Sequence, residues 1–395
     1  MEPSSQLTSI KRDDSARWYR VCTDNGFEGT YPYVWLRDNC RCSQCFNPSF
    51  NQRTLKIVDL DPDVIPSSET IVDDGQVLRV IWPDQHRSDF QAAWLSRRHF
   101  SDRPRDLVTD PELQSWGAEL NGNIPTFDFQ KLLEDDVELY NWLDVLNTKG
   151  LAFVKGAPTE KGAGGQIAER IAYLRRTLFG ETFQVSTAIN PSRPAHTLQA
   201  IGLHVDQPYL NYLPGIQMLH CIEKINVEGA ENQFADGLRV AEQIREEYSE
   251  EYHLLTTREV DYETTGVQFG KSFHLKSRLP TIQLDMDGKF QCIRYADIWR
   301  ATSMSKVPVG QVTKMYKALK LLNDVMYRPE NLVRHQLAEG EIVTFSNHRV
   351  LHSRSAITIT GEGSRHLEGS YIDWDEALSR MRVLHRKLFC SDARP

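Results

Sequence analysis

Several features that would assign the chain to a membrane or to nucleic acid are missing from the sequence. No apolar run approaches the roughly 18 residues that span a bilayer. The formal net charge of -8 disfavours non-specific binding to nucleic acid or to an anionic membrane surface. The opening MEPSSQLTSIKRDD has neither the apolar stretch of a secretory signal nor the arginines of a transit peptide. We therefore expect a cytoplasmic globular protein with no nucleic-acid partner and no membrane partner.

Cysteine is scarce and unevenly placed. There are seven cysteines, an odd number, and Cys40, Cys42 and Cys45 lie within one six-residue stretch. This spacing is not a disulfide framework, and it fits a reducing compartment. With His86, in the run WPDQH, the three thiols supply a Cys3His set, which is a closed tetrahedral geometry of structural zinc. The alternative is that the thiols are free and His86 is a surface residue.

The pattern of apolar residues changes along the chain. Residues 1–100 contain short alternating segments broken by turn residues, which predicts a small β-rich domain that a zinc ion would hold together. Residues 101–124 are polar and contain proline and glycine, which predicts a linker. Residues 125–395 mix helical and strand-like patterns. We expect an α+β protein whose larger domain has an antiparallel sandwich or barrel core with flanking helices.

Periodicity also predicts individual elements of the larger domain. The expected helices are Thr126–Leu146, Gly165–Phe179, Val309–Met326 and Trp374–Leu388. The expected strands are Leu151–Val154, Ile216–Ile222, Thr281–Met286, Glu341–Phe345 and Leu367–Ile372.

Three residues have the chemistry of a non-haem iron site. On a strand, His204 and Asp206 would point to the same face, roughly 6–7 Å apart. His352, after a strand-like run, is the candidate third ligand. A face of two histidines and one carboxylate leaves open positions that suit Fe(II) and O2. The alternative is that both histidines are hydrogen-bonded residues of the core.

An arginine thirteen residues after His352 makes the pattern more specific. Arg365 can bind a carboxylate through two parallel hydrogen bonds, so it would hold a co-substrate that has a distal carboxylate. A zinc hydrolase with the same three ligands would lack a general base and would leave Arg365 without a role. A non-catalytic, zinc-stabilised binding protein would not need the ligands and the arginine intact.

Longer motifs resemble one family. The runs WLRDNC, CxCxxC, WPD, SRHLEG and DWD are similar to those of the gamma-butyrobetaine dioxygenase family, and trimethyllysine dioxygenase is a more distant relative. The similarity runs from about Tyr31 to Leu388. It implies a double-stranded β-helix (jelly-roll) core with an N-terminal zinc domain, and a homodimer. It also implies an Fe(II)/2-oxoglutarate-dependent dioxygenase that uses O2 to hydroxylate an unactivated C–H bond, with ascorbate as reductant.

The resemblance implies roles for individual residues. His204, Asp206 and His352 would hold Fe(II), and Arg365 would hold 2-oxoglutarate. The other two co-substrate positions are Leu219 and Asn232. The positions that match the family's substrate site are Phe179, Phe183, Arg193, His196, Gln207, Asp297 and Tyr371.

The substrate positions depart from the family pattern. The family encloses a trimethylammonium group with three tyrosines and a tryptophan, a cation–π arrangement. Of these rings only Tyr371 is kept, beside Phe179, Phe183 and His196. The favoured substrate is gamma-butyrobetaine, which would be hydroxylated to carnitine. The alternatives are the same chemistry on another betaine, modified amino acid or specialised metabolite and, more remotely, an inactive binding protein.

Overall fold

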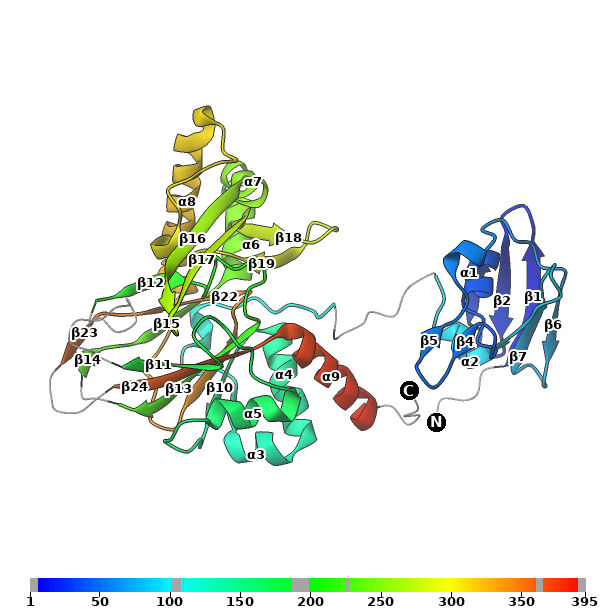
Figure 1. The fold of residues 1–395 in the computed structure, drawn as a ribbon, viewed down its shortest axis with the longest axis horizontal. Coiled ribbons are helices and arrows are strands. Elements are labelled where there is room, and N and C mark those ends of the chain that lie inside the picture. The colour runs from blue at the N-terminus through cyan, green and yellow to red at the C-terminus, as the bar shows by residue number, and fades with distance from the viewer. Residues whose placement is uncertain are drawn as a thin grey trace. The chain divides into compact units, whose positions relative to one another are not determined.

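The chain forms two compact units, residues Met1–Asp106 and Leu107–Pro395 (Figure 1). The computed structural model describes residues 6–100, 108, 110–186, 199–224, 227–359 and 365–389. The boundary falls inside the expected linker of residues 101–124. The later part of that stretch belongs to the second unit, since Trp116 is 3% exposed and its Nε1 donates to the carbonyl of Lys149 at 2.7 Å.

The first unit consists of short strands, as the sequence predicts. One three-stranded antiparallel sheet contains β1 (Leu7–Asp13), β2 (Trp18–Thr23) and β3 (Glu28–Pro32), and another contains β6 (Ser68–Val72), β7 (Val77–Ile81) and β8 (Arg87–Gln91). The smaller elements are α1 (Tyr33–Asp38), β4 (Phe46–Asn47), β5 (Gln52–Arg53) and α2 (Ala92–Ser96). Tyr31, Leu36 and Trp82 lie in its single small core.

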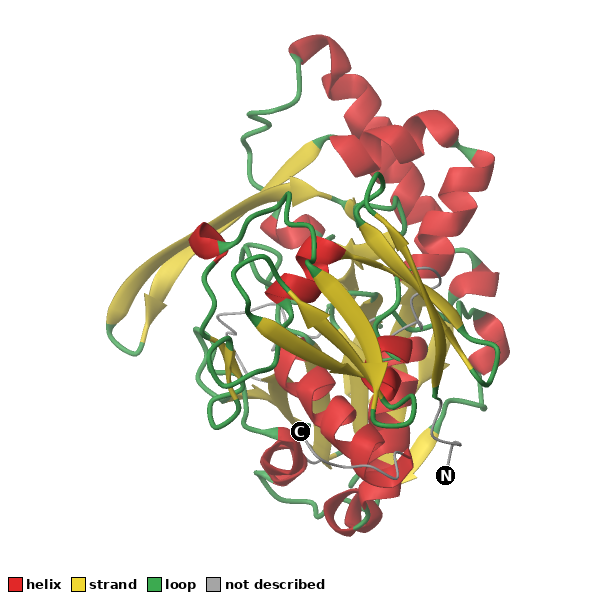
Figure 2. Cartoon of the chain, turned by 90° about the vertical axis from the view of Figure 1, so that its right-hand side faces the viewer, coloured by secondary structure: helices red, strands yellow, loops and turns green. Residues whose placement is uncertain are grey.

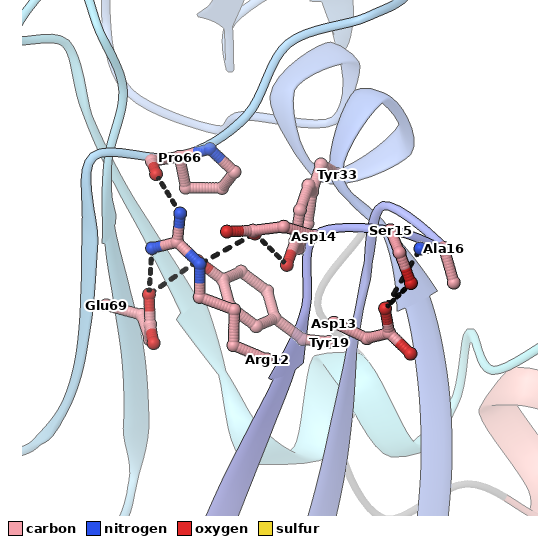
Figure 3. A network of polar contacts seen from close by, with 9 residues as sticks. All are labelled: Arg12, Asp13, Asp14, Ser15, Ala16, Tyr19, Tyr33, Pro66 and Glu69. Carbon is pink, nitrogen blue, oxygen red and sulfur yellow. Dashed lines mark hydrogen bonds and ion pairs between the residues drawn. The ribbon is translucent and has the colours of Figure 1, made fainter.

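A polar network links the two sheets of this unit (Figure 3). Arg12 of β1 donates from Nε to Asp14 at 2.7 Å, from Nη1 to Glu69 of β6 at 3.2 Å and from Nη2 to the carbonyl of Pro66 at 2.8 Å. The hydroxyl of Tyr19 in β2 also donates to Glu69, at 2.8 Å. Hydrogen bonds thus supplement a core that is thin for a unit of this size.

The second unit is built around two packed sheets. The six-stranded sheet has the order β11 (Thr182–Ser186), β24 (His366–Ile372), β13 (Ile216–Glu223), β21 (Ile342–Ser346), β10 (Leu151–Lys155) and β9 (Thr126–Asp128). The four-stranded sheet has the order β12 (Ile201–His204), β22 (Val350–Arg354), β15 (Asn232–Asp236) and β20 (Val333–His335). Phe234 and Phe345 meet between the sheets with ring centroids 5.9 Å apart.

Helices cover the outer face of the six-stranded sheet (Figure 1). These helices are α3 (Phe129–Glu134), α4 (Asp136–Thr148), α5 (Ala163–Ile171) and α9 (Trp374–Phe389). Trp142 of α4 and Met381 of α9 share a buried cluster with Ile216 and Met218 of β13. Side chains on both faces of β13 are buried from Ile216 to Ile222, so its sequence is mostly apolar and does not alternate between apolar and polar residues.

Most of the remaining elements lie between β15 and β21 in sequence. They are α6 (Gly237–Glu247), α7 (Ser249–Thr257), β16 (Glu259–Gln268), β17 (Lys271–Pro280), β18 (Ile282–Leu284), β19 (Phe290–Ile293) and α8 (Val312–Met326). Strands β16 and β17 form an antiparallel hairpin, whose two long arrows curve away on the left of Figure 2. The small pair β14 (Val227–Gly229) and β23 (Ile357–Ile359) completes the sheets. Within the described residues, none of these helices has the length and apolar character needed to cross a bilayer.

Candidate active site

Pairing between two neighbouring strands brings the three predicted iron ligands together. His204 ends β12, His352 lies in β22, and the two residues are direct partners in the antiparallel register. Asp206 follows two residues after His204. Its Oδ1 lies 3.4 Å from Nε2 of His204 and 3.9 Å from Nε2 of His352. One ligand atom from each of the three lies within 4.8 Å of the others.

The ring orientations leave nitrogen lone pairs free for a metal. Nδ1 of His204 donates to the carbonyl of Gly202 at 2.8 Å, so Nε2 is the unprotonated nitrogen that faces Asp206. Burial lowers the pKa of His352 to about 3, so this imidazole is neutral at pH 7. Metal ligation requires neutral imidazoles and an ionised carboxylate. The three donors could therefore bind Fe(II) on one side of the ion.

Asp206 is held through both its backbone and its carboxylate. Its N–H donates to Oδ1 of Asn347 at 2.7 Å, and its carbonyl accepts from Nδ2 of Asn347 at 3.0 Å. The hydroxyl of Tyr371 donates to Oδ2 of Asp206 at 2.5 Å. Burial alone would raise the pKa of Asp206, but the hydrogen bond donated by the Tyr371 hydroxyl is among the interactions that hold this pKa below its usual range. The carboxylate is thus ionised and oriented.

The two predicted co-substrate residues Arg365 and Asn232 line one small pocket. Arg365 comes directly before β24, is 8% exposed, and has its pKa lowered by burial. No hydrogen bond or ion pair joins its guanidinium to any residue in the described part of the chain, so it is available to an anion. Leu219, the third position, is buried in β13 among the residues that pack between the sheets.

A cavity of about 400 Å³ opens beside His204 and Asp206. Its lining residues are Leu178, Phe179, Phe183, Gln184, Val185, Ile201, His204, Asp206, Gln207, Tyr209, Thr264, Thr265, Gly266, Val267, Gln268, Phe273, Ile298, Trp299 and Tyr371. Four of the predicted substrate positions are among them: Phe179, Phe183, Gln207 and Tyr371. Arg193 and His196 lie outside the described residues.

Asp297, expected at the substrate, is not among the lining residues. Its carboxylate accepts a hydrogen bond from the Tyr295 hydroxyl at 2.8 Å and lies 3.2 Å from the Arg300 guanidinium. Its neighbours Ile298 and Trp299 line the cavity in its place. The difference arises because residues Asp297–Trp299 form a 3-10 turn, in which successive side chains point in different directions.

Aromatic side chains form part of the cavity wall. Tyr371 stacks on Phe183 with ring centroids 5.5 Å apart, and Phe179 lies 6.4 Å from Phe183. Trp299 also lines the cavity, and its ring is 6.0 Å from that of His204. The tip of the Phe183 ring lies over Gly369, where an added Cβ would come 2.0 Å from Cζ of the ring. A glycine at this position of β24 therefore allows the wall to form.

Gln207 places an unusual polar group in this wall. It is 1% exposed and has a positive φ of 56°, and its carboxamide lies beside the Tyr371 hydroxyl but makes no well-formed hydrogen bond to a described residue. A buried amide without partners is costly, by about 1–3 kcal/mol. Strain and unsatisfied polar atoms of this kind cluster at binding sites.

Sequence reasoning missed several residues of the site. Trp299 and the hairpin residues Thr264, Thr265 and Phe273 line the cavity, but only the tertiary fold brings them there. Asn347 had a signal, since it lies five residues before His352 in the run SNHRVLH. A polar residue in a turn next to a ligand strand is a natural partner for the backbone of another ligand segment.

The second predicted metal centre also assembles. The Sγ atoms of Cys40, Cys42 and Cys45 lie 3.3, 3.4 and 3.5 Å from Nε2 of His86. A tetrahedron with Zn–S bonds of about 2.3 Å and a Zn–N bond of about 2.0 Å has S–N edges of about 3.5 Å. The Cys3His set is therefore compatible with zinc. It joins the segment after α1 to the turn between β7 and β8.

Comparison with known proteins matches both units. Residues 10–96 match the gamma-butyrobetaine hydroxylase-like N-terminal family, and residues 108–371 match the taurine catabolism dioxygenase TauD, TfdA family. The chain is 34% identical to gamma-butyrobetaine dioxygenase of Homo sapiens over 379 residues, which cover 95% of this chain and 96% of that protein.

Two further relatives extend the match. Gamma-butyrobetaine dioxygenase of Pseudomonas sp. (strain AK-1) is 32% identical over 389 residues, 98% of this chain and 97% of that protein. Trimethyllysine dioxygenase, mitochondrial, of Bos taurus is 30% identical over 357 residues, 90% of this chain and 82% of that protein.

Proposed function

The chain belongs to the gamma-butyrobetaine dioxygenase family and is a non-haem Fe(II)/2-oxoglutarate-dependent dioxygenase, and on that premise we propose that it hydroxylates gamma-butyrobetaine to carnitine. One observation carries the proposal. His204 and Asp206 line a cavity that has aromatic walls and is large enough for a small substrate. A C–H bond held in this cavity would lie next to the metal ligands.

We assign the iron to His204, Asp206 and His352 and the distal carboxylate of 2-oxoglutarate to Arg365. Bound Fe(II) and 2-oxoglutarate supply the oxidising chemistry, in which O2 and 2-oxoglutarate are consumed, succinate and CO2 are released, and a C–H bond becomes C–OH. The chain's own residues supply the rest. The two imidazoles and the carboxylate of Asp206 offer the donors, and the unpaired guanidinium of Arg365 offers two parallel hydrogen bonds to a carboxylate.

The cavity suits a cation that cannot donate hydrogen bonds. Its lining includes six aromatic rings, and no lysine or arginine occurs among the lining residues of the described chain. The faces of these rings attract a quaternary ammonium by cation–π interaction, about 0.5–2 kcal/mol for each well-placed ring.

A second candidate, the same chemistry on a modified amino acid, is favoured by Gln207. The buried carboxamide presents both a donor and an acceptor, whereas a carboxylate alone uses only the donor. A substrate with an amide or an amino group beside its carboxylate would satisfy both. A site that forms hydrogen bonds to a polar group of its substrate strongly rejects analogues that lack this group.

Other features accompany this proposal. We propose that the two facing sheets form a double-stranded β-helix, and that Cys40, Cys42, Cys45 and His86 hold a structural zinc. Asn232 would support the co-substrate carboxylate from the pocket that it shares with Arg365. The homodimer, the use of ascorbate, the cytoplasmic location and the substrate roles of Arg193 and His196 stay predictions.

The test is a coupled product assay. The purified protein is incubated in air with Fe(II), ascorbate, 2-oxoglutarate and gamma-butyrobetaine, and succinate and carnitine are quantified. We expect equal amounts of the two products. Succinate without carnitine would reject this substrate, and a panel of amino acids would then test the second candidate. No succinate with any substrate would reject both.

A further inference from the structure

The two oxygens of the Asp206 carboxylate have different surroundings. Oδ1 faces the two imidazoles, at 3.4 Å from Nε2 of His204 and 3.9 Å from Nε2 of His352. Oδ2 instead accepts the hydroxyl of Tyr371 at 2.5 Å. A carboxylate with free oxygens can turn about its side-chain torsion, but here one oxygen is already committed to a donor. Oδ1 is therefore the oxygen that faces the metal position.

The backbone of Asp206 is fixed independently. Asn347 is fully buried and binds the Asp206 peptide twice, at its N–H and at its carbonyl. The same carboxamide donates to the carbonyl of Pro214 at 3.2 Å, which anchors Asn347 itself. Asn347 lies in the turn that leads into β22, the strand of His352. One turn thus sets the positions of two of the three metal ligands.

We propose that Asn347 and Tyr371 are positioning residues that make Asp206 a one-oxygen metal ligand. Asn347 fixes where the residue sits, and the hydroxyl of Tyr371 fixes which oxygen faces the metal. Without that hydroxyl, Oδ2 is free to turn to the metal as well. A two-oxygen carboxylate would then occupy a position that this kind of site leaves open for 2-oxoglutarate or O2. The inference rests on the proposed iron site.

Different atoms of Tyr371 contact the cavity and the candidate metal ligand Asp206. Its ring stacks on Phe183 and forms part of the cavity wall, while its hydroxyl points to Asp206. Tyr371→Phe removes only the hydroxyl and keeps the ring. Phe183→Leu is the matched variant, because it removes the stacked ring and keeps the hydroxyl.

The two variants separate the roles in one set of measurements. The affinity for Fe(II) is measured by anaerobic titration, and the Fe(II)–2-oxoglutarate complex is followed by its visible charge-transfer absorption. For Tyr371→Phe we expect Fe(II) affinity about tenfold weaker, as for other residues that orient metal ligands, together with a shifted absorption band. We also expect kcat to fall with little change in the substrate KM. Phe183→Leu should show the reverse: wild-type iron affinity, an unshifted band and a raised KM.

Two outcomes would overturn the proposal. One is that Tyr371→Phe binds Fe(II) as the wild type does, with an unshifted band. The other is that Asn347→Ala, which removes the backbone clamp, folds normally and leaves iron affinity unchanged; this second variant also decides the matter if Tyr371→Phe does not fold. His204→Ala distinguishes failure of the premise, since wild-type iron affinity in that variant would reject the iron site itself.

Discussion

The two candidate metal centres differ in how their ligands are distributed along the chain and in what surrounds them. Cys40, Cys42 and Cys45 come from one short segment, and His86 closes a four-ligand set. His204 and His352 come from distant strands, and their three-ligand set opens on a cavity of about 400 Å³.

The difference matches two uses of a metal. A closed set of four ligands holds a small unit together, and an open set of three leaves room for reactants. The first unit has one small core, so its fold would depend on the metal. The second unit has three separate clusters of buried apolar residues, so it should fold without iron.

The largest expected effect is loss of activity without loss of fold. His352→Ala removes one of three ligands, and we expect more than about a 100-fold drop in kcat, because even residues that only support metal ligands contribute 10–100-fold. The temperature of unfolding should change little. The exposed residue His253 provides the control, since His253→Ala should be fully active. Retained 2-oxoglutarate turnover in His352→Ala would contradict the assignment.

Next comes loss of fold in one unit. Cys45→Ser should abolish zinc binding and the unfolding transition of the first unit, while the transition of the second unit stays at its wild-type temperature. Calorimetry with zinc analysis measures both. Cys22→Ser is the matched control, because Cys22 lies in β2 outside the cluster. A zinc-free Cys45→Ser protein with wild-type unfolding would show that the metal is not structural.

A smaller effect concerns the co-substrate. Arg365→Met should raise the KM for 2-oxoglutarate about 10- to 100-fold, since charge-assisted hydrogen bonds to a carboxylate contribute roughly 1.5–3 kcal/mol. Iron affinity in the absence of 2-oxoglutarate should stay unchanged. Arg245→Met, at an exposed position of α6, serves as control. An unchanged KM would remove Arg365 from the site.

The smallest predicted effect concerns the cavity wall. Gly369→Ala places a methyl group where the Phe183 ring now lies, within 2.0 Å of it, so the ring must move. We expect the substrate KM to rise severalfold, while 2-oxoglutarate binding and iron affinity are retained. Gly310→Ala, where a Cβ would meet no atom within 4 Å, should leave steady-state kinetics unchanged. A wild-type KM in Gly369→Ala would argue that Phe183 does not contact the substrate.

Elements with a strong local pattern were predictable from the sequence. The apolar run Ile216–Ile222 is β13, and the periodic segment Trp374–Leu388 is α9, each within one residue at its ends. The expected helix Thr126–Leu146 is instead β9, α3 and α4. Asp128 and Asp135 accept hydrogen bonds from the N–H groups of Lys131 and Val137, so each aspartate starts a new helix. Periodicity alone does not detect such caps.

The residues of the two sites likewise differ in how well the sequence predicts them. The Cys3His cluster and the His204–Asp206 pair are short motifs whose residue types state their chemistry. Trp299 and Phe273 are single aromatic residues without a motif, and they reach the cavity only through the 3-10 turn and the β16–β17 hairpin. A buried side chain such as Gln207 becomes notable only when its missing partners are known. The tertiary fold brings these residues to the cavity, and no local sequence pattern predicts it.

The measurement that tests the account most directly is metal analysis of the full chain after anaerobic loading with Fe(II). We predict one zinc and one iron per chain, with iron lost and zinc retained in His204→Ala, and zinc lost and iron retained in Cys45→Ser. Two zinc ions per chain and no iron, or loss of both metals in both variants, would contradict the existence of two independent centres with different tasks.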